Sequence, residues 1–486
     1  MLHKEEEKIR VRFLIVLTRK NRKYLGAEII QGVLGMMRGV RRCVRASCMF
    51  LILLLGMFLL APLISASEWK MALHDSCNTG YTNETIPDEP ELLWSYEIPW
   101  WEQLFYFKRE GYRITVFLFP ERISSYPVVA DGKVFVIFNN KLYAFDADTG
   151  KIIWSYKPYS FEGLPFSSVI AIDDGKLFVK FDKIYAFNAE TGKIIWSVAI
   201  KNVHSIAVAE GKLYVISEDP KVLSDKIYIL DEDTGDLIRC FRIENPVGIA
   251  VANGKIFVRS FHKRYVSDEK GISSVAKIWH ELNVLDGNTG KILWKHEPGE
   301  NVAPFIPIVI ADGKVFVGSE EYSKIYALDE DTGDLIWCYN LTHNIPSSIA
   351  IAPGKVFVST KNGKIYALDE DTGDLIWCYE IIDDSYKSYI SSMVITDEKV
   401  FVGTEGGKIC ALNVDTGDLI WSYDLGKHIY STMANSIAIA DRKVFVCAGG
   451  VKIYCFGARE GKSVSGFEVI FALAGLLVIA YLLRRK

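Results

Sequence analysis

One short pattern recurs along most of this chain and constrains its fold more than any other feature. A polar turn ending in Thr-Gly precedes a short apolar segment that usually contains tryptophan, as in Asp-Ala-Asp-Thr-Gly-Lys-Ile-Ile-Trp, which ends at Trp154. The turn glycine recurs at intervals of 40 to 44 residues, apart from one interval of 55, at positions 150, 192, 235, 290, 333, 373, 417 and, in a degenerate copy, 461. Most of the chain therefore consists of copies of one repeated unit, and the long interval indicates an insertion in one copy.

Each repeat contains four short runs with the alternation of half-buried β-strands. In one repeat these runs cover residues 348–352, 356–358, 364–368 and 375–379. A four-stranded antiparallel sheet cannot bury both of its faces alone, so neighbouring sheets have to stack, and ring closure removes exposed outer faces. The sequence thus predicts an all-β fold, an eight-bladed propeller. The last repeat lacks a fourth strand, and we expect the similar segment 92–96 to complete the eighth blade.

The recurring tryptophans and acidic turns have structural explanations. Trp154 and its equivalents recur in the fourth strand of nearly every repeat, as one ring per blade would if it filled the gap between blades. Arg239 replaces tryptophan in the third blade, and we expect that junction to be less apolar. The Asp-Thr-Gly turns resemble calcium loops, but position 12 counted from Asp329 is Asn340 rather than glutamate. We therefore expect tight turns in which Asp side chains accept bonds from backbone N–H groups.

Both ends of the chain carry apolar segments next to basic residues. Several arginines precede the uncharged run 46–67, which predicts a signal peptide or an uncleaved N-terminal anchor. The apolar run 469–483 ends in Arg-Arg-Lys, which predicts a C-terminal anchor, and the Ser-Gly-Phe before it is similar to the Pro-Gly-Phe of cleaved archaeal surface-sorting tails. We expect three parts, with the second outside the cell: a leader at 1–67, the propeller at 68–462 and the tail at 463–486.

The composition excludes some partners. The net charge of −4 comes from interspersed acids and bases, so nucleic acid is not expected as a partner. Equivalent cysteines such as Cys338 and Cys378 fall in separate repeats, beyond the reach of a disulfide, and zinc-type Cys/His spacing is absent from the sequence. Asn83 and Asn340 begin Asn-X-Thr triplets and are glycosylation candidates.

Several of these segments resemble a known family. Val-Phe-Val-Gly-Thr at 400–404, the recurring Lys-Ile-Tyr-Ala-Leu-Asp, Asp-Thr-Gly and Ile-Trp are similar to the pyrroloquinoline-quinone-like repeat. The segment from Trp69 to Tyr81 is similar to the lead-in of such propellers. The resemblance covers about residues 69–462 and implies the ring. The family includes quinone-dependent alcohol dehydrogenases, a bacterial outer-membrane assembly scaffold and sensor domains, so the resemblance does not select a function.

A quinone enzyme would need an axial slot, calcium ligands and a carboxylate base. Family members with this activity typically carry a vicinal cysteine pair, and this sequence has no Cys-Cys dipeptide. The innermost strands instead begin with small neutral residues, and we expect a polar channel mouth whose candidate ligand-binding residues include Ser168, Ser348 and Ser392. Isolated histidines are more often solvated than metal ligands, which is our expectation for three in predicted loops at one end: His204, His343 and His428.

Two insertions depart from the repeat, and loops on a rigid scaffold often carry specific function. The first, 99–126, mixes aromatic and charged residues of the interface type, and either binds a partner or folds across the ring with its aromatics buried. Its candidate binding residues are Trp100, Trp101, Phe105, Tyr106, Phe107, Arg109 and Tyr112. The second, 259–280, is expected to be a solvated loop, or else a contact for a partner or an envelope polymer.

These features favour a binding module over an enzyme. We expect a cell-surface, membrane-anchored scaffold whose loop-rich end binds a protein, a peptide or a cell-envelope glycan. The alternative is an alcohol dehydrogenase dependent on pyrroloquinoline quinone (PQQ) and calcium, with the cofactor at the channel mouth. A structural component of the envelope is a third hypothesis. The sequence assigns no catalytic or metal-binding residue, and it leaves the oligomeric state open.

Overall fold

The chain forms antiparallel sheets throughout the part that its computed structural model describes. This part comprises residues 75, 78–99, 106–110, 113–117, 125–138, 141–158, 169–200, 202–217, 225–267, 273–297, 308–319, 323–342, 344–381, 389–426, 436–448 and 452–459. Of residues 106–110, 113–117, 263–267 and 273–279, the backbone alone is described. The described strands make eight four-stranded sheets and one two-stranded sheet.

Blades 1 to 4 each consist of four consecutive strands. Blade 1 comprises β4 (Val128–Ala130), β5 (Lys133–Phe138), β6 (Lys141–Asp146) and β7 (Ile152–Tyr156). Blade 2 comprises β8 (Ile170–Asp173), β9 (Lys176–Lys180), β10 (Ile184–Asn188) and β11 (Ile194–Val198). Blade 3 comprises β12 (Val203–Ala209), β13 (Lys212–Ser217), β14 (Asp225–Asp231) and β15 (Leu237–Ile243). Blade 4 comprises β16 (Pro246–Ala252), β17 (Lys255–Ser267), β18 (Ser273–Asp286) and β19 (Ile292–His296).

Blades 5 to 7 repeat this order, and blade 8 departs from it. Blade 5 comprises β20 (Val309–Ala311), β21 (Lys314–Ser319), β22 (Lys324–Asp329) and β23 (Leu335–Asn340). Blade 6 comprises β24 (Pro346–Ala352), β25 (Lys355–Thr360), β26 (Lys364–Asp369) and β27 (Leu375–Glu380). Blade 7 comprises β28 (Ile390–Ile395), β29 (Lys399–Thr404), β30 (Lys408–Asn413) and β31 (Leu419–Asp424). Blade 8 comprises β32 (Ser436–Ala440), β33 (Lys443–Ala448), β34 (Lys452–Gly457) and the N-terminal β1 (Glu91–Glu97).

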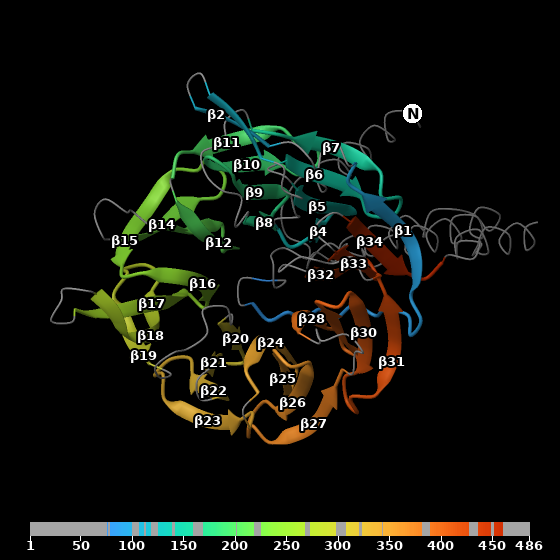
Figure 1. The fold of residues 1–486 in the computed structure, drawn as a ribbon. Helices are drawn as coiled ribbons and strands as arrows, with labels where there is room; N and C mark the ends of the chain where they lie inside the picture. The colour runs from blue at the N-terminus through green and yellow to red at the C-terminus, as the bar shows by residue number, and fades with distance from the viewer. Residues whose placement is uncertain are drawn as a thin grey trace, which may run out of the picture. The chain divides into compact units, whose positions relative to one another are not determined.

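The innermost strands close the ring. β4 contacts β8, the contacts continue in chain order through β12, β16, β20, β24 and β28 to β32, and β32 contacts β4. Figure 1 looks along the ring axis, with the blades in sequence around it. β1 pairs antiparallel with β34, so that Leu92 lies opposite Phe456. The predicted eight-bladed propeller is therefore confirmed, as is the N-terminal strand that completes its last blade.

The hydrophobic core lies between successive blades. The second strand of a blade is buried on both faces, as in β25, where Val356, Phe357 and Val358 have no exposed surface. Val356 and Val358 pack against blade 5, whereas Phe357 packs against blade 7. This two-sided burial explains why the strands of the repeat are rich in β-branched and aromatic residues.

The recurring tryptophans fasten each blade to the next. Six indole N–H groups donate to a backbone carbonyl of the following blade at 2.8 to 3.1 Å, those of Trp94, Trp154, Trp196, Trp294, Trp337 and Trp377. Each ring also covers a turn glycine of that blade, as Trp337 covers Gly373. The predicted packing between blades is confirmed. At Arg239 the expected loss of apolar contact is wrong in part, because Phe241 covers Gly290 instead, although a phenyl ring cannot donate the hydrogen bond.

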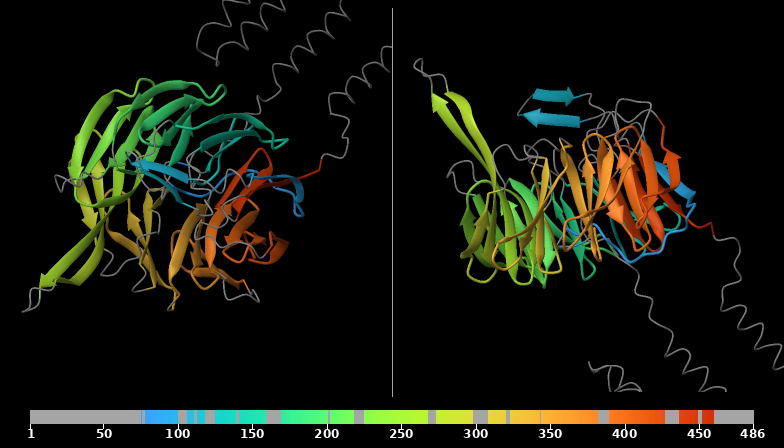
Figure 2. Two further views of the ribbon diagram at one scale, coloured as in Figure 1. Left: turned by 45° about the horizontal axis from the view of Figure 1, so that its top comes forward. Right: turned by 90° about the horizontal axis from the view of Figure 1, so that it is seen from below.

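Both sequence insertions contain β-hairpins. β2 (Tyr106–Glu110) pairs with β3 (Arg113–Phe117) within the first insertion. The expectation of a solvated loop at 259–280 is wrong: β17 and β18 continue as one antiparallel ladder, pairing Ser260 with Glu281 and Ser267 with Ser273. Figure 2 shows this hairpin projecting beyond the sheet from which it grows. The residues that suggested solvation therefore lengthen two strands of blade 4.

The predicted leader and tail, including the archaeal-type sorting signal, lie outside the described residues. None of the described segments forms a helix with the length and apolarity needed to cross a bilayer. Membrane attachment and export therefore stay predictions from the sequence.

Candidate functional site

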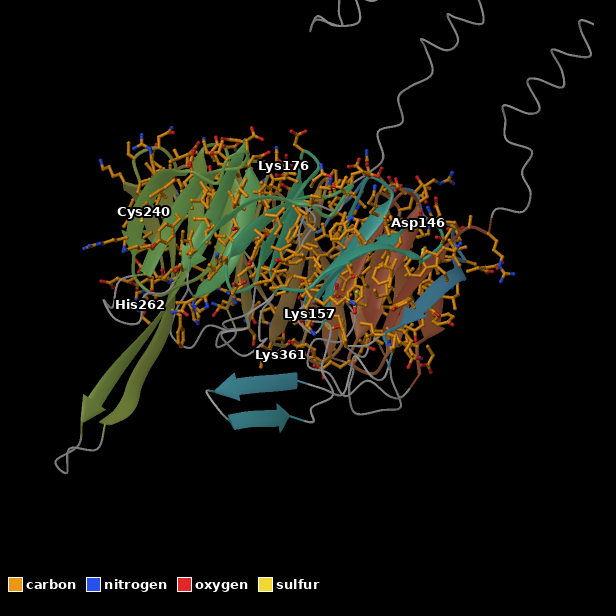
Figure 3. All side chains as sticks on the ribbon, turned by 90° about the horizontal axis from the view of Figure 1, so that it is seen from above. Asp146, Lys157, Lys176, Cys240, His262 and Lys361 are labelled. Carbon is orange, nitrogen blue, oxygen red and sulfur yellow. The ribbon has the colours of Figure 1, made fainter. Side chains whose placement is uncertain are left out.

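The two ends of the ring differ because strand direction alternates within each blade. Turns from the first to the second strand and from the third to the fourth lie at one end, here called the turn end. The connections from the second to the third strand, and those from the fourth strand to the next blade, lie at the other end of the ring. This end is here called the hairpin end because β17 and β18 project from it. Figure 3 shows Asp146 and Lys176 at the turn end and Lys157, His262 and Lys361 at the hairpin end.

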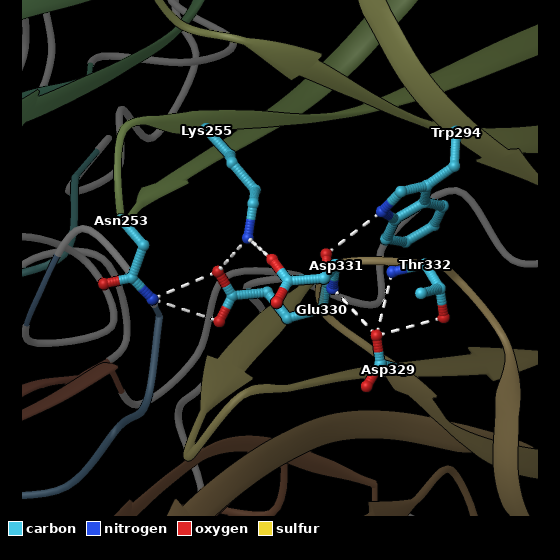
Figure 4. Close-up of polar contacts among 7 residues, drawn as sticks. All are labelled: Asn253, Lys255, Trp294, Asp329, Glu330, Asp331 and Thr332. Atoms are coloured by element: carbon cyan, nitrogen blue, oxygen red, sulfur yellow. Dashed lines mark hydrogen bonds and ion pairs between the residues drawn. The ribbon is translucent and has the colours of Figure 1, made fainter.

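The turn end is fastened by ion pairs between blades. Lys255 at the start of β17 lies 2.8 Å from the Glu330 carboxylate and 2.5 Å from that of Asp331 in blade 5 (Figure 4). Burial disfavours the charged form of Lys255, but hydrogen bonds to Asp331 and Glu330 outweigh it and raise the Lys255 pKa. Lysines in the same register pair across five other junctions, namely Lys133, Lys176, Lys314, Lys355 and Lys443. These turns serve as structural fasteners.

The Asp-Thr-Gly turns close on themselves, as predicted. The Asp329 carboxylate accepts bonds from the Thr332 N–H at 2.8 Å and from the Thr332 hydroxyl at 3.0 Å, and Gly333 has a φ of +76°. The backbone hydrogen bond from Thr332 is the largest cause of a lowered Asp329 pKa. The carboxylate is thus engaged by its own turn.

An N-terminal segment covers inner strands at the turn end. Backbone hydrogen bonds join Thr79 to Ile351 of β24, and Ile395 of β28 to both Gly80 and Thr82. The ammonium of Lys399, itself buried, donates to the Ile86 carbonyl at 2.8 Å. Part of the inner rim at this end is therefore occupied by the chain itself, and the hairpin end is the better candidate for contact with another molecule.

Only some of the candidate binding residues of the first insertion belong to the described part of the chain. Tyr106, Phe107 and Arg109 lie on β2, whose backbone alone is described. Trp100, Trp101, Phe105 and Tyr112 lie outside the described residues. The first insertion begins where β1 ends, and the C-terminal end of β1 lies at the hairpin end of the ring. The strands of the insertion therefore connect to the ring at the hairpin end. Binding by these residues stays a prediction.

The serine candidates lie on innermost strands and are largely enclosed. Ser348 is buried on β24, and Ser392 is buried on β28, where its hydroxyl accepts a hydrogen bond from the Ile437 N–H at 3.3 Å. Their neighbours are engaged too: the Ser391 hydroxyl donates to the Gly403 carbonyl at 3.1 Å. Ser168 lies outside the described residues. These hydroxyls contribute to packing of the inner strands, and ligand binding by them stays a prediction.

The remaining sequence candidates are histidines, glycosylation sites and cysteines. His204 lies on strand β12 rather than in a loop, and His343 and His428 lie outside the described residues. Asn83 and Asn340 are both exposed, as glycosylation requires, and glycosylation itself stays a prediction. Among the described cysteines, including Cys338 and Cys378, none forms a disulfide.

A polar cluster at the base of the β17–β18 hairpin was not found from the sequence. On the face toward blade 3, Glu281 lies 3.3 Å from His262 and 2.6 Å from Lys295. Next to it, the buried Asn283 amide donates to the Ser260 hydroxyl at 3.4 Å. Ser260, Glu281 and Asn283 are buried although they are polar, whereas Lys295 is exposed.

The opposite face of the same base carries Arg259, His280 and His296. Burial, helped by the charges of Arg259 and His262, lowers the His280 pKa to about 4, against a weaker opposing contact with the Ser260 backbone. Burial alone lowers the Arg259 pKa to about 10 and also lowers that of His296. The Phe261 ring lies over His280, with centroids 4.8 Å apart. At neutral pH this face therefore carries one guanidinium charge and two neutral imidazoles.

Within the described part of the chain, the side chains do not offer the ligands of a quinone–calcium centre. Among the described residues, no three His, Cys, Asp or Glu side chains lie close enough together to hold a metal ion. Calcium takes six to eight oxygen ligands, usually with several carboxylates. Many of the described carboxylates are instead engaged in turns, as Asp329 is, or paired with lysine, as Glu330 is. We therefore derive no catalytic step through PQQ or calcium.

The ring, its fasteners and its two different ends define the class of protein as a repeat propeller with insertions at one end. The family described as outer membrane protein assembly factor BamB matches residues 139–238, 180–275 and 280–480. The matched segments make up more than half of the chain, so the protein belongs to this family of PQQ-like repeats. The resemblance stated from the sequence is confirmed at this level.

Solved structures with the same fold include two dehydrogenases and BamB. Quinohemoprotein alcohol dehydrogenase from Comamonas testosteroni shares 16% identity, covering 84% of this chain and 83% of its own, with a TM-score of 0.57. A europium-containing methanol dehydrogenase shares 14% identity over 81% of this chain and 98% of its own, with a TM-score of 0.59. BamB from Moraxella catarrhalis shares 14% identity over 76% of this chain and 100% of its own, with a TM-score of 0.51. Curated protein sequences gave no match.

Proposed function

We propose that this protein is a non-catalytic binding scaffold whose partner contacts the hairpin end of the ring. The observation that carries the proposal is the β17–β18 ladder, which continues to Ser267 and Ser273, whereas β16 pairs with β17 only as far as Ser260. Beyond that point, the outer edges of the hairpin have no strand beside them among the described residues. Unpaired strand edges are templates for binding an extended segment of a partner.

A protein is the partner class that the family favours. The family model is described as an assembly factor, which supports a protein partner at this level. We propose the first insertion as a second contact, with Trp100, Trp101, Phe105, Tyr106, Phe107, Arg109 and Tyr112 as its binding residues. Aromatic and arginine side chains are enriched at the centres of protein interfaces. A peptide and a cell-envelope glycan are the two other partner classes proposed from the sequence.

We also propose that the ring lies outside the cell and is attached to the membrane. The basic residues before 46–67 and after 469–483 support this orientation. Protease treatment of intact cells tests it: cleavage of the propeller without lysis is expected, and protection until lysis would contradict it.

The alternative, a dehydrogenase dependent on PQQ and calcium, is tested by calorimetry. Titrating the full chain with PQQ and calcium chloride, together and separately, is expected to give no binding heat from folded protein. Stoichiometric binding followed by oxidation of an alcohol with an artificial electron acceptor would replace the scaffold proposal.

The scaffold proposal is tested by comparing variants in native membranes. One variant joins Lys263 to Ile278 through Asn-Gly, which removes the distal hairpin, and a second lacks residues 99–126. The matched control reverses two exposed charges at the turn end, Lys193→Glu and Lys291→Glu. Quantitative affinity capture is expected to lose the same proteins with either deletion and to keep them with the control. Equal recovery from all variants would contradict the proposal.

A further inference from the structure

The junction between blades 4 and 5 contains polar side chains at the hairpin end. Blade 4 turns one face of β17, β18 and β19 toward blade 5, as shown by the packing of Phe257, Leu282 and Trp294 against Val315 and Val317. Strand alternation places Arg259, His280 and His296 on that same face of blade 4. It also places Ser319 on the face of β21 that carries Val315 and Val317.

Contacts confirm that these side chains lie at the junction. The His296 ring packs edge-on against Tyr326 of β22 in blade 5, with centroids 5.9 Å apart. Arg259 lies opposite Gly248 of β16, and a Cβ atom on that glycine would be 3.8 Å from the guanidinium. His280 and Ser319 are fully enclosed, whereas Arg259 and His296 are only partly buried, so the group extends from the interior to the surface.

Several of the buried polar atoms lack a hydrogen-bond partner within the described part of the chain. They are Nε2 of His296, Oγ of Ser319 and, apart from a weak contact with the Ser260 backbone, the ring nitrogens of His280. A buried polar group without a partner costs about 1 to 3 kcal/mol, so such groups are rare and call for an explanation. Several at one junction, beside a guanidinium, indicate a place where a bound group accepts hydrogen bonds from the serine hydroxyl and from the one N–H group of each neutral imidazole.

We propose that this junction binds a carboxylate group of a ligand, with Arg259 as its ionic partner and His280, His296 and Ser319 as hydrogen-bond donors. The planar guanidinium matches a carboxylate in shape and can donate two parallel hydrogen bonds. With both histidines neutral at pH 7, Arg259 is the cationic group of this set, and a carboxylate brings a single negative charge into a largely enclosed site. Enclosing a doubly charged phosphate costs more free energy.

This inference goes beyond the scaffold proposal and does not depend on it. Arg259 lies on the second strand of its blade, and its guanidinium lies beside Gly248 of the innermost strand. The carboxylate can belong to a small organic acid or to the C-terminus of a peptide. The chemistry recognised is the same in both cases.

Nuclear magnetic resonance of the full chain with labelled histidine tests the site directly. Sodium acetate and acetyl-glycyl-glycine are the probes, with sodium chloride at equal ionic strength as the reference and the amide of the peptide as the neutral control. Saturable shifts of the His280 and His296 ring signals, with His204 unchanged, are expected for both acids but not for the amide. Absence of these shifts, or equal shifts with the amide or with phosphate, would overturn the proposal.

Variants separate ligand binding from general packing. Arg259→Gln is expected to weaken acetate binding at least tenfold, and Arg259→Lys to restore part of it, because lysine keeps the charge but loses the planar fork. Lys180→Gln is the matched control, since Lys180 holds the same register position in blade 2, and unchanged acetate binding is expected. Unchanged binding in folded Arg259→Gln would contradict the assignment. If that variant does not fold, the wild-type titration still decides.

Discussion

Gly373 and Gly354 illustrate two different reasons for glycine in this repeat, namely a positive φ and close contact with a tryptophan ring. Both have positive φ, +74° and +76°, but a Cβ on Gly373 would lie 2.6 Å from the Trp337 ring, whereas a Cβ on Gly354 would meet nothing within 4 Å. We expect Gly354→Ala to cost about 1 kcal/mol from backbone strain alone. We expect Gly373→Ala to cost about 3 kcal/mol because steric overlap with the indole is added. Denaturant unfolding measures both, and equal costs would contradict the role of the ring.

His280 gives the fold a defined pH dependence. Its pKa of about 4 in the folded protein lies below the ordinary value of 6.5, so the folded state holds fewer protons than the unfolded state between these values. Stability is therefore lost as the pH falls from about 6.5 toward 4, by about 2 to 3 kcal/mol at 1.36 kcal/mol per pKa unit. His280→Gln is expected to show a smaller loss of unfolding free energy between pH 7.5 and pH 4.5 than wild type. Parallel profiles would contradict this role for burial.

The sequence predicted the residues that repeat and missed those that do not. Trp337, Gly373 and Asp329 occur in equivalent copies, so one physical argument applied to all of them. Arg259 and His280 occur in one blade only. Arg259 is partly buried and His280 is fully buried, and this burial depends on which face of an extended strand each residue occupies. Because the insertion was expected to be a loop, strand alternation was not applied to it.

The β17–β18 hairpin should be removable without loss of the ring. Pairing with neighbouring strands ends at Ser260 on β17 and at Leu282 on β18, so residues beyond His262 are held in the ladder by the partner strand of the same hairpin. Replacing 264–277 with Asn-Gly provides the two-residue turn that suits a hairpin. We expect a melting temperature within a few degrees of wild type, measured by circular dichroism. Global unfolding would show that the distal hairpin packs against the ring.

At the scale of the element, the repeat was predictable and the hairpin was not. Apolar runs of three to five residues, bounded by Asp-Thr-Gly, Pro-Gly or Asn-Gly, predicted the four strands of blade 6 to within a few residues. The run from Arg259 to Ser267 places Phe261 and Tyr265 on one face of a strand, but its basic side chains made solvation the simpler expectation. The length of a hairpin depends on pairing between its strands, which composition alone does not give.

Over the whole ring, the junctions between blades are not equally fastened. Lys255 pairs with the buried Glu330, whereas Lys212, in the same register at the junction of blades 3 and 4, lies next to a turn whose sequence, Gly-Asn-Thr-Gly, has no acid. We expect Lys255→Met to cost about 2 kcal/mol because it leaves a buried carboxylate without its cation. We expect Lys212→Met to cost less than about 0.5 kcal/mol. Denaturant unfolding compares the two variants, and equal costs would contradict the role assigned to the ion pairs.

The same uneven fastening predicts where the ring opens most easily. The junction of blades 3 and 4 has Phe241 in place of an indole N–H donor and has no ion pair at Lys212 among the described residues. Hydrogen exchange is therefore expected to be faster in β15 and β16 than in β19 and β20. Slower exchange at this junction than at that of blades 4 and 5 would show that packing, rather than these polar contacts, determines the local stability.

The central claim is that a partner contacts the hairpin end, and site-specific photocrosslinking in native membranes tests it most directly. A benzophenone amino acid would replace the exposed Lys157 or Glu244 at the hairpin end and, in matched variants, the exposed Lys193 or Lys291 at the turn end. Both hairpin-end positions are expected to form adducts with a common protein, and the turn-end positions are not. Adducts from the turn end alone, or equally from both ends, would contradict the account.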